Sequence, residues 1–262
     1  MRIERFGGPD PTVAVVGGIH GDEPCGWTAI ERVLSADYDY DRPVAFVAAN
    51  EEAINAGERY LEEDLNRAFP GDSDGDTRES RLAADVAEVV AGCETLSLHS
   101  TQSYERAFAI VSTIDEWARR VCPRLSVDAV VDAGAFDRGR IFAVTDRVVE
   151  VECGLQGSER AANNATQIVE EFLAATGAID APAADPTADL PVYELTRSIS
   201  KSRAPNYEVH ASNFERVEAG EPFAVAGEEN VVAPEPFYPV LMSAYGYDEL
   251  FGYAAEYVGT MP

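Results

Sequence analysis

Val13-Ala-Val-Val-Gly-Gly-Ile-His-Gly-Asp-Glu23 is the stretch that decides the fold of this 262-residue chain. Its valine-rich start predicts a buried strand of a mostly parallel sheet, because the apolar run is short and ends at turn residues. Gly17 and Gly18 allow a sharp turn and a close approach to the backbone. His20 and Glu23 follow at the C-terminal end of this strand, where open α/β sheets bind their ligands. An imidazole and a carboxylate at this spacing can bind one metal ion, and a catalytic zinc site needs a third protein ligand from elsewhere in the chain.

The pattern beyond this stretch predicts an α/β domain followed by a smaller β domain. Strands are expected at 13–16, 44–49, 95–98, 108–112, 129–131 and 148–153, and helices at 24–34, 77–90, 115–121 and 158–175. This alternation is typical of an α/β domain, which we place at residues 1–176. Residues 177–191 are rich in Ala, Pro and Asp and are expected to be a linker. Residues 192–262 hold short β-like runs between Gly and Pro turns, which predicts a small all-β domain.

The composition restricts the function and the environment of the protein. Apolar residues make up 46% of the chain, so it is globular, but 47 acidic residues face only 20 basic ones and the net charge is −27. Lys201 is the only lysine. Acids spread along the whole chain are typical of a halophile's protein, where salt screens self-repulsion, and an acidic surface for a basic partner is the alternative. The charge argues against nucleic-acid binding.

We expect a cytoplasmic protein without a membrane segment. The start, Met1-Arg-Ile-Glu-Arg5, is charged and unlike a signal peptide, and no apolar run approaches the roughly 20 residues of a membrane helix. The four cysteines form no CxxC pair, which favours buried or free thiols in a reducing compartment. The pattern does not predict an oligomeric state.

His99 supplies the third ligand of the expected metal site. The chain has only three histidines, and His20 and His99 each follow an apolar run that reads as a core strand. With Glu23, they form a His2Glu set, which is a standard catalytic zinc set. We therefore expect one zinc ion per chain.

Four motifs occur in the order known from one hydrolase family: Gly18-Ile-His-Gly-Asp-Glu23, Asp64-Leu-Asn-Arg-Ala-Phe-Pro-Gly71, Leu98-His-Ser-Thr101 and Val151-Glu-Cys-Gly154. Together they resemble the succinylglutamate desuccinylase/aspartoacylase family, a branch of the zinc carboxypeptidase-like hydrolases. The motifs cover about the first 155 residues, and Tyr238-Pro-Val-Leu-Met-Ser-Ala-Tyr-Gly-Tyr247 resembles the family's C-terminal β domain. The resemblance implies a mixed β-sheet flanked by helices, with a small C-terminal all-β domain.

The resemblance also implies roles for individual residues. His20, Glu23 and His99 match the zinc ligands. Asn66 and Arg67 match residues that bind the substrate carboxylate, and Arg59 matches the arginine that polarises the scissile carbonyl. Glu152 matches the general acid/base, with Glu150 as a rival on the same strand face. Tyr247 matches a tyrosine of the substrate pocket, and Tyr245 is the alternative.

Two positions depart from the family's pattern. Ser97 stands where members often have an Asp that could orient the ring of the distant His. Asp22 stands where Asn is commoner, which places another anion near the metal. Both departures bear on zinc affinity, and neither removes a ligand.

The expected function is zinc-dependent hydrolysis of the amide bond in a small anionic N-acyl amino acid of the N-succinylglutamate or N-acetylaspartate type. Zinc activates water, a glutamate carries the proton, and an arginine stabilises the oxyanion. Two alternatives remain: a metallocarboxypeptidase acting on short peptides, and a non-catalytic, zinc-stabilised acidic binding protein.

Overall fold

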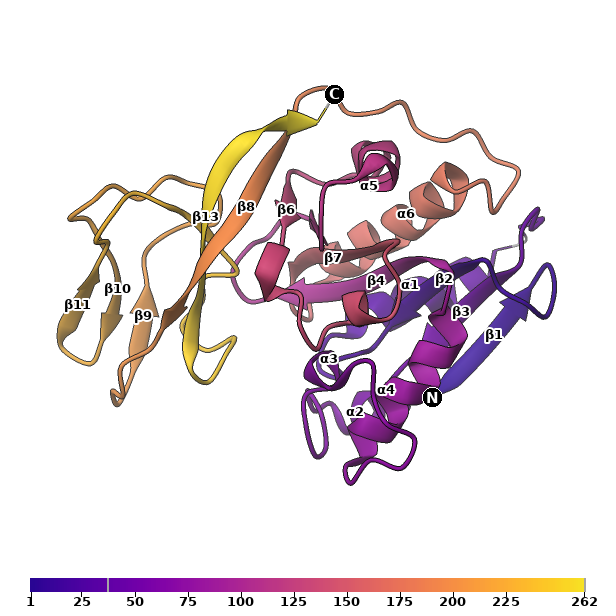
Figure 1. Cartoon of the computed structure of the whole chain (residues 1–262), viewed down its shortest axis with the longest axis horizontal. Helices are drawn as coiled ribbons and strands as arrows, with labels where there is room; N and C mark the ends of the chain where they lie inside the picture. The colour runs from indigo at the N-terminus through magenta and orange to yellow at the C-terminus, as the bar shows by residue number, and fades with distance from the viewer. Residues whose placement is uncertain (37, 262) are drawn as a thin grey trace.

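Ten strands form one mixed β-sheet, and a smaller sheet lies beyond it at the C-terminal end (Figure 1). The structure is a computed structural model that describes residues 1–36 and 38–261. In spatial order the strands are β1 (Arg2–Phe6), β3 (Val44–Ala48), β2 (Val13–Gly17), β4 (Glu94–Thr101), β7 (Val148–Leu155), β5 (Phe108–Val111), β6 (Val130–Asp132), β8 (Leu190–Ser200), β13 (Leu250–Met261) and β12 (Tyr238–Val240).

The central strands are parallel, and this places their C-terminal ends at one edge. β2 pairs in parallel with β3 and β4, and β4 pairs in parallel with β7. His20 follows β2, while His99 and Glu152 lie opposite each other on β4 and β7. The topology therefore brings residues from three distant parts of the sequence to one edge of the sheet.

Helices cover both faces of the parallel part of the sheet. α1 (Pro24–Leu34), α5 (Glu116–Val121) and α6 (Glu159–Ala175) pack on one face, and α4 (Arg78–Val90) packs on the other. Residues of β2 alternate between the two cores, with Val13 and Val15 on the α1 side and Ala14 and Val16 on the α4 side. Burial on both faces explains why these strands read as continuous apolar runs.

Short helices complete this half of the molecule. α2 (Glu51–Ala56) and α3 (Leu65–Ala68) lie near the site, and 3-10 helices span Cys122–Arg124, Gly134–Phe136 and Ile141–Ala143. The predicted helix 24–34 is confirmed, and α4 and α6 begin one residue inside the predicted ranges. Thr77 and Ser158 cap these helices, each accepting a hydrogen bond from the backbone three residues later.

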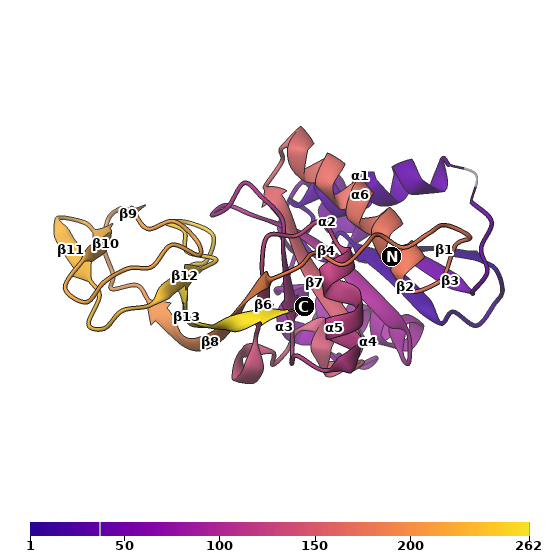
Figure 2. The same ribbon diagram turned by 90° about the horizontal axis from the view of Figure 1, so that it is seen from above.

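The C-terminal region is built differently from the prediction in one respect. A separate three-stranded antiparallel sheet exists, in the order β11 (Glu229–Val232), β10 (Pro222–Ala226), β9 (Tyr207–Val209), but β8, β13 and β12 belong to the main sheet. β8 already begins at Leu190, inside the predicted linker, and pairs in parallel with β6. Figure 2 shows this end projecting from the α/β part. The division into 1–176 and 192–262 stays a prediction, since one hydrogen-bonded sheet runs through both parts.

Two further expectations can be compared with the structure. The four cysteines are buried and free, as predicted. Among the described residues, every helix is too short or too polar to cross a bilayer.

Candidate functional site

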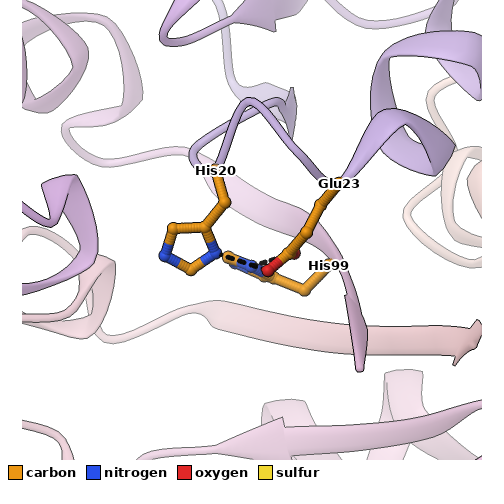
Figure 3. Close-up of side chains that lie close together, drawn as sticks. All are labelled: His20, Glu23 and His99. Atoms are coloured by element: carbon orange, nitrogen blue, oxygen red, sulfur yellow. Dashed lines mark hydrogen bonds and ion pairs between the residues drawn. The ribbon is translucent and has the colours of Figure 1, made fainter. Parts of the chain in front are cut away.

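His20, Glu23 and His99 converge at the C-terminal edge of the parallel strands (Figure 3). His20 Nδ1 lies 2.8 Å from Glu23 Oε1, and His99 Nδ1 lies 3.2 Å from Glu23 Oε2. One possible ligand atom from each residue lies within 4.8 Å of the others, and all three residues are buried. The structure thus brings together the three residues that the sequence placed in one ligand set.

Two glycines hold the loop that carries His20 against α2. Gly18 has a φ of 69°, and a Cβ at this position would lie 2.3 Å from Ile54 Cδ1. A Cβ at Gly21 would lie 2.1 Å from the carbonyl carbon of Ala53. Any side chain at either position would push the loop away from α2. The sequence predicted that another group comes close to the backbone at the glycines. In the structure, that group is α2 of the same chain.

Glu23 is turned inward from the position that precedes α1. Its Oε2 accepts a hydrogen bond from the backbone N–H of Ser100 at 3.0 Å. Burial opposes ionisation, but the charge of His20 and hydrogen bonds from both histidines hold the pKa of Glu23 well below its ordinary value. Glu23 is therefore ionised and fixed, as a carboxylate ligand must be.

The second ring nitrogen of each histidine, Nε2, points away from the centre and also has a polar partner. His20 Nε2 lies 3.1 Å from Asp64 Oδ1. His99 Nε2 lies 3.1 Å from Ser97 Oγ and 3.9 Å from Glu150 Oε1. Burial disfavours the charged ring of His20, but Glu23 and the hydrogen bond to Asp64 raise its pKa to about 9. Partners on the outward nitrogens fix each ring so that Nδ1 faces the centre.

The centre fits a zinc ion. Its donor set is two imidazoles and one carboxylate, which zinc takes readily, and a catalytic site needs three such ligands with one position left open. The three side chains border a cavity on the open side. The residues present are therefore sufficient to hold zinc and to leave one side of it accessible.

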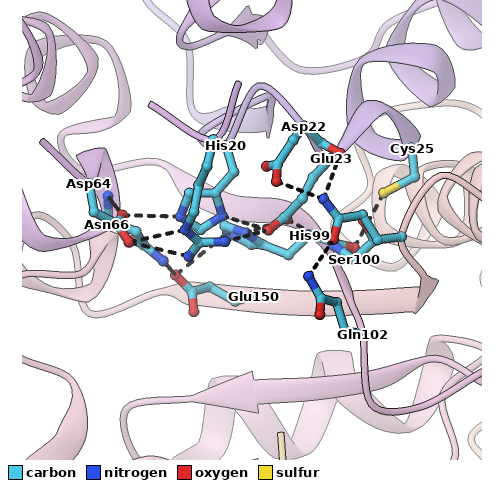
Figure 4. Close-up of polar contacts among 12 residues, drawn as sticks. His20, Asp22, Glu23, Cys25, Asp64, Asn66, His99, Ser100, Gln102 and Glu150 are labelled. Atoms are coloured by element: carbon cyan, nitrogen blue, oxygen red, sulfur yellow. Dashed lines mark hydrogen bonds and ion pairs between the residues drawn. The ribbon is translucent and has the colours of Figure 1, made fainter. Parts of the chain in front are cut away.

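Arg59 lies beside this centre on a loop that a buried carboxylate clamps. Arg59 Nη1 donates to Glu23 Oε1 at 3.2 Å, and Arg59 Nη2 donates to Asp64 Oδ2 at 3.2 Å. Figure 4 labels the two accepting carboxylates, Glu23 and Asp64. Glu79, which is fully buried on α4, accepts hydrogen bonds from the backbone N–H groups of residues 61, 62 and 63 at 2.9, 3.2 and 3.4 Å. Asn50 Nδ2 adds a fourth hydrogen bond at 3.2 Å. Glu79 thus fixes the segment between Arg59 and Asp64.

Asn66 and Arg67 also border the cavity. Asn66 is buried: its Nδ2 donates to Glu150 Oε1 at 3.1 Å, and its Oδ1 accepts from the backbone of Ile141 at 3.3 Å. Arg67 is exposed and donates to the Asn66 carbonyl at 2.7 Å, with no carboxylate partner among the described residues. Arg67 therefore has a guanidinium available for an anion.

Glu150 and Glu152 lie on the same face of β7, as predicted, but their environments differ. Glu150 is 1% exposed and hydrogen-bonded to Asn66 and Arg140. Glu152 lines the cavity, and its buried Oε2 has no hydrogen-bond partner. Burial and the nearby Glu23 raise the pKa of Glu152 above its ordinary value. Of the two, Glu152 has the oxygen that is free to exchange a proton.

The segment 243–248 of the C-terminal region closes one side of the cavity. Tyr247 is partly buried and packs edge-on against Tyr253, and burial raises the pKa of its hydroxyl. Tyr245 is 63% exposed, and its hydroxyl accepts from the backbone of Tyr207. Lys201 donates to the carbonyl of Tyr247, with Nζ 4.9 Å from the centre of the Tyr207 ring. The sole lysine therefore holds the segment that carries both tyrosines.

The cavity has a volume of about 480 Å³ and contains every predicted site residue. His20, Glu23, His99, Arg59, Asn66, Arg67, Glu152, Tyr245 and Tyr247 all line it. Glu150 lies behind this lining.

Several residues at the site were not predicted to act there. Arg140 is buried and lines the cavity, and Asp64 faces His20. Gln156 Nε2 donates to Asp22 Oδ2 at 2.7 Å and joins two loops of the site. The chain has 19 arginines, so the nearness of Arg138 and Arg140 in the sequence was no distinctive signal for Arg140. The clamp by Glu79 had no local signal, because its partners are 16 to 29 residues away.

Fold and site together define an α/β protein with a buried His2Glu centre at the mouth of a polar cavity. Residues 9–108 match the model of the succinylglutamate desuccinylase/aspartoacylase catalytic domain. Over these residues the chain is therefore similar to the succinylglutamate desuccinylase/aspartoacylase family.

Individual relatives match parts of the chain. The N-alpha-acetyl-L-2,4-diaminobutyric acid deacetylase of Halomonas elongata is 29% identical over 164 residues, which is 53% of this chain and 48% of the relative. A probable aspartoacylase of Nostoc sp. is 29% identical over 127 residues, which is 44% of this chain and 43% of the relative. The chain thus aligns with less than half the length of each of these curated relatives.

The fold is shared with solved structures over nearly the whole chain. The crystal structure of murine aminoacylase 3 superposes with a TM-score of 0.77 at 20% identity, covering 98% of this chain and 99% of that one. This likeness, at low identity, extends the shared fold through the C-terminal region.

Proposed function

We propose that the protein is a zinc-dependent hydrolase that cleaves the amide bond of a small N-acyl amino acid. The observation that carries the proposal is one cavity lined by the His2Glu set, by a buried glutamate with a free oxygen and by arginines. The names of the matched relatives, a deacetylase and an aspartoacylase, support the same class of reaction.

His20, Glu23 and His99 would hold the zinc ion. Zinc, when bound there, would lower the pKa of a water molecule and polarise the acyl carbonyl. The outward partners of the two histidines, Asp64 and Ser97, would keep both Nδ1 atoms available for the metal.

Glu152 and Arg59 would act on the reacting atoms. The free Oε2 of Glu152 takes the proton of the attacking water and later returns it to the leaving amine. A raised pKa suits this exchange, because it makes the carboxyl group a better proton acceptor and leaves it able to return the proton. Arg59, which already reaches Glu23, stabilises the negative charge that develops on the acyl oxygen.

Asn66, Arg67 and Tyr247 would bind the amino-acid part of the substrate. The guanidinium of Arg67 can receive a carboxylate in a bidentate pair. Tyr247 faces the same cavity, and its phenol stays protonated and able to donate, because burial raises its pKa. Both groups favour an anionic substrate of the N-acetylaspartate or N-succinylglutamate type.

The cavity argues against both alternative functions. A volume of about 480 Å³, closed on one side by segment 243–248, suits a small molecule better than a peptide chain. A purely structural zinc site is closed by a fourth protein ligand, whereas here the three ligands border the cavity.

We further propose that the protein works in the reducing, salt-rich cytoplasm of a halophile. The net charge of −27 and the four buried free thiols support this environment.

The test is the release of free amine from a panel of substrates with zinc present in molar KCl. N-acetylaspartate, N-succinylglutamate, N-acetyl-2,4-diaminobutyrate, a neutral N-acetyl amino acid and a dipeptide cover the classes. The Glu152→Gln variant, which keeps the shape of the side chain, controls for contaminating activity. Release from an N-acyl amino acid that the variant cannot achieve supports the proposal. Cleavage of the dipeptide alone would assign a peptidase, and no release from the zinc-loaded protein would refute the proposed reaction.

A further inference from the structure

Ser97 and Glu150 lie side by side on neighbouring strands, and each is two residues before a residue of the site. In the parallel pair of β4 and β7, Ser97 is opposite Glu150 and His99 is opposite Glu152. Glu152 therefore lies beside the ligand histidine itself, and Glu150 lies beside the small side chain of Ser97.

His99 presents its two nitrogens to different groups. Nδ1 faces Glu23 and the centre, so a zinc ion there requires the proton of the ring to sit on Nε2. Ser97 Oγ, at 3.1 Å, accepts a hydrogen bond from that nitrogen, and Glu150 Oε1 lies 3.9 Å away. His20 has the same arrangement, but a carboxylate contacts its Nε2 directly: Asp64 Oδ1 lies 3.1 Å from this nitrogen.

Glu150 also contacts the part of the cavity that would bind substrate. Its Oε1 accepts from Asn66 Nδ2 at 3.1 Å, and its Oε2 pairs with Arg140 Nη2. Asn66 and Arg140 both line the cavity, and Glu150 is 1% exposed. One buried carboxylate therefore connects a metal ligand with two polar groups of the substrate side.

We infer that Glu150, together with Ser97, is a positioning residue that orients His99 for zinc and holds Asn66 and Arg140 for the substrate. This inference rests on the proposed function, since it assigns the partners of the proposed zinc site. It also gives Ser97 a role. The Ser97 hydroxyl and the Glu150 carboxylate together orient the ring of His99, as the Asp64 carboxylate orients the ring of His20.

The first experiment measures the zinc affinity of the metal-free full chain by competition with a chromophoric chelator. Glu150→Gln keeps the shape and removes the charge, and we expect its zinc affinity to fall by about 10–100-fold. Glu94→Gln is the matched control. Glu94 is also a buried carboxylate hydrogen-bonded to arginines, Arg42 and Arg120, but it lies at the opposite end of β4. The control should keep the zinc affinity of the unchanged chain.

A second variant separates the two roles and does not disturb a buried charge. Ser97→Ala removes the hydrogen bond to His99 but leaves the contacts of Glu150 with Asn66 and Arg140. It should weaken zinc binding without raising KM at saturating zinc, whereas Glu150→Gln should do both.

Equal zinc affinities for Glu150→Gln, Glu94→Gln and the unchanged chain would overturn the inference. Equal weakening in both glutamine variants would overturn it too, because the effect would then be general destabilisation. If Glu150→Gln does not fold, an unchanged zinc affinity in Ser97→Ala is sufficient to refute the pairing. The zinc measurement needs no substrate, so it stays informative even if the proposed hydrolysis fails.

Discussion

Replacing Glu79 by Gln tests whether one buried carboxylate holds the loop of the site in place. The change removes the charge and keeps the shape of a side chain that accepts four hydrogen bonds. The glutamine oxygen can still accept from Leu61 and Asn50. The NH₂ of the glutamine would instead face the backbone N–H groups of Glu62 and Glu63. Both sides are then hydrogen-bond donors, so these two hydrogen bonds are lost.

The expected cost follows from these contacts. A hydrogen bond to a charged group contributes about 1.5–3 kcal/mol, and two are lost, so the free energy of unfolding should fall by about 3–6 kcal/mol. This is a large share of the roughly 5–15 kcal/mol that holds a typical protein folded. Because the loop carries Arg59 and Asp64, kcat/KM should also fall, by up to about 10²-fold if the groups move by 1 Å.

Denaturant unfolding at constant high salt measures the first effect. Glu88→Gln, an exposed glutamate on the same helix, controls for the change in net charge. The difference between the unchanged chain and Glu79→Gln should also depend on pH. Burial opposes ionisation, but the backbone N–H groups and Asn50 lower the pKa of Glu79 below its ordinary 4.5. Its stabilising contribution is therefore complete above about pH 4.5 and is lost as the pH falls through the folded-state value.

A loss below about 1 kcal/mol, no larger than that of Glu88→Gln, would refute the clamp, because hydrogen bonds to a buried charge should cost more. A difference that persists unchanged well below pH 4 would show that the carboxylate charge is not the cause.

Three further outcomes are expected. Glu152→Gln should lower kcat by about 10²–10⁴-fold. Its zinc content, measured by metal analysis, should equal that of the unchanged chain, since Glu152 is not among the proposed ligands. A loss of zinc would contradict its assignment as proton carrier. The midpoint of thermal unfolding should rise with KCl concentration, because 27 net negative charges then repel one another less. The screening length falls from about 30 Å at 0.01 M to about 3 Å at 1 M. An equal rise in sucrose would show that charge screening is not the cause. Lys201→Met should raise KM without changing zinc affinity, because the segment with Tyr247 loses its hydrogen bond and its cation–π contacts; an unchanged KM would show that the segment holds itself in place.

The parallel core and the three residues of the His2Glu centre could be predicted from the sequence because their signals are local. The Val13–Val16 strand is buried on both faces and therefore reads as an apolar run, and His20 and Glu23 lie within seven residues of it. His99 stood out because histidine is rare and the residue follows a second core strand. Their convergence then follows from the parallel order of β2 and β4.

Short β runs in the C-terminal region could be predicted, but their place in the main sheet and the supporting residues could not, for a physical reason in each case. β13 pairs with β8 through three irregularities in register, so its side chains do not keep a simple alternation. Gly252 and Gly259 interrupt its apolar pattern further. Glu79 and Arg140 act through partners that only the fold brings near. A buried ionised side chain has the same sequence pattern as an exposed one until its partners are known.

The single lysine also has a chemical consequence. Apart from the N-terminus, Lys201 is the only primary amine in the chain, and it lies next to the segment that closes the cavity. An amine-reactive dye would therefore attach at no more than two positions, one of them adjacent to the tyrosines of the cavity. Labelling after the N-terminal amine has been chemically blocked would place a reporter group there without mutagenesis. Fluorescence from that position would register the entry of a small molecule, whichever one the cavity binds.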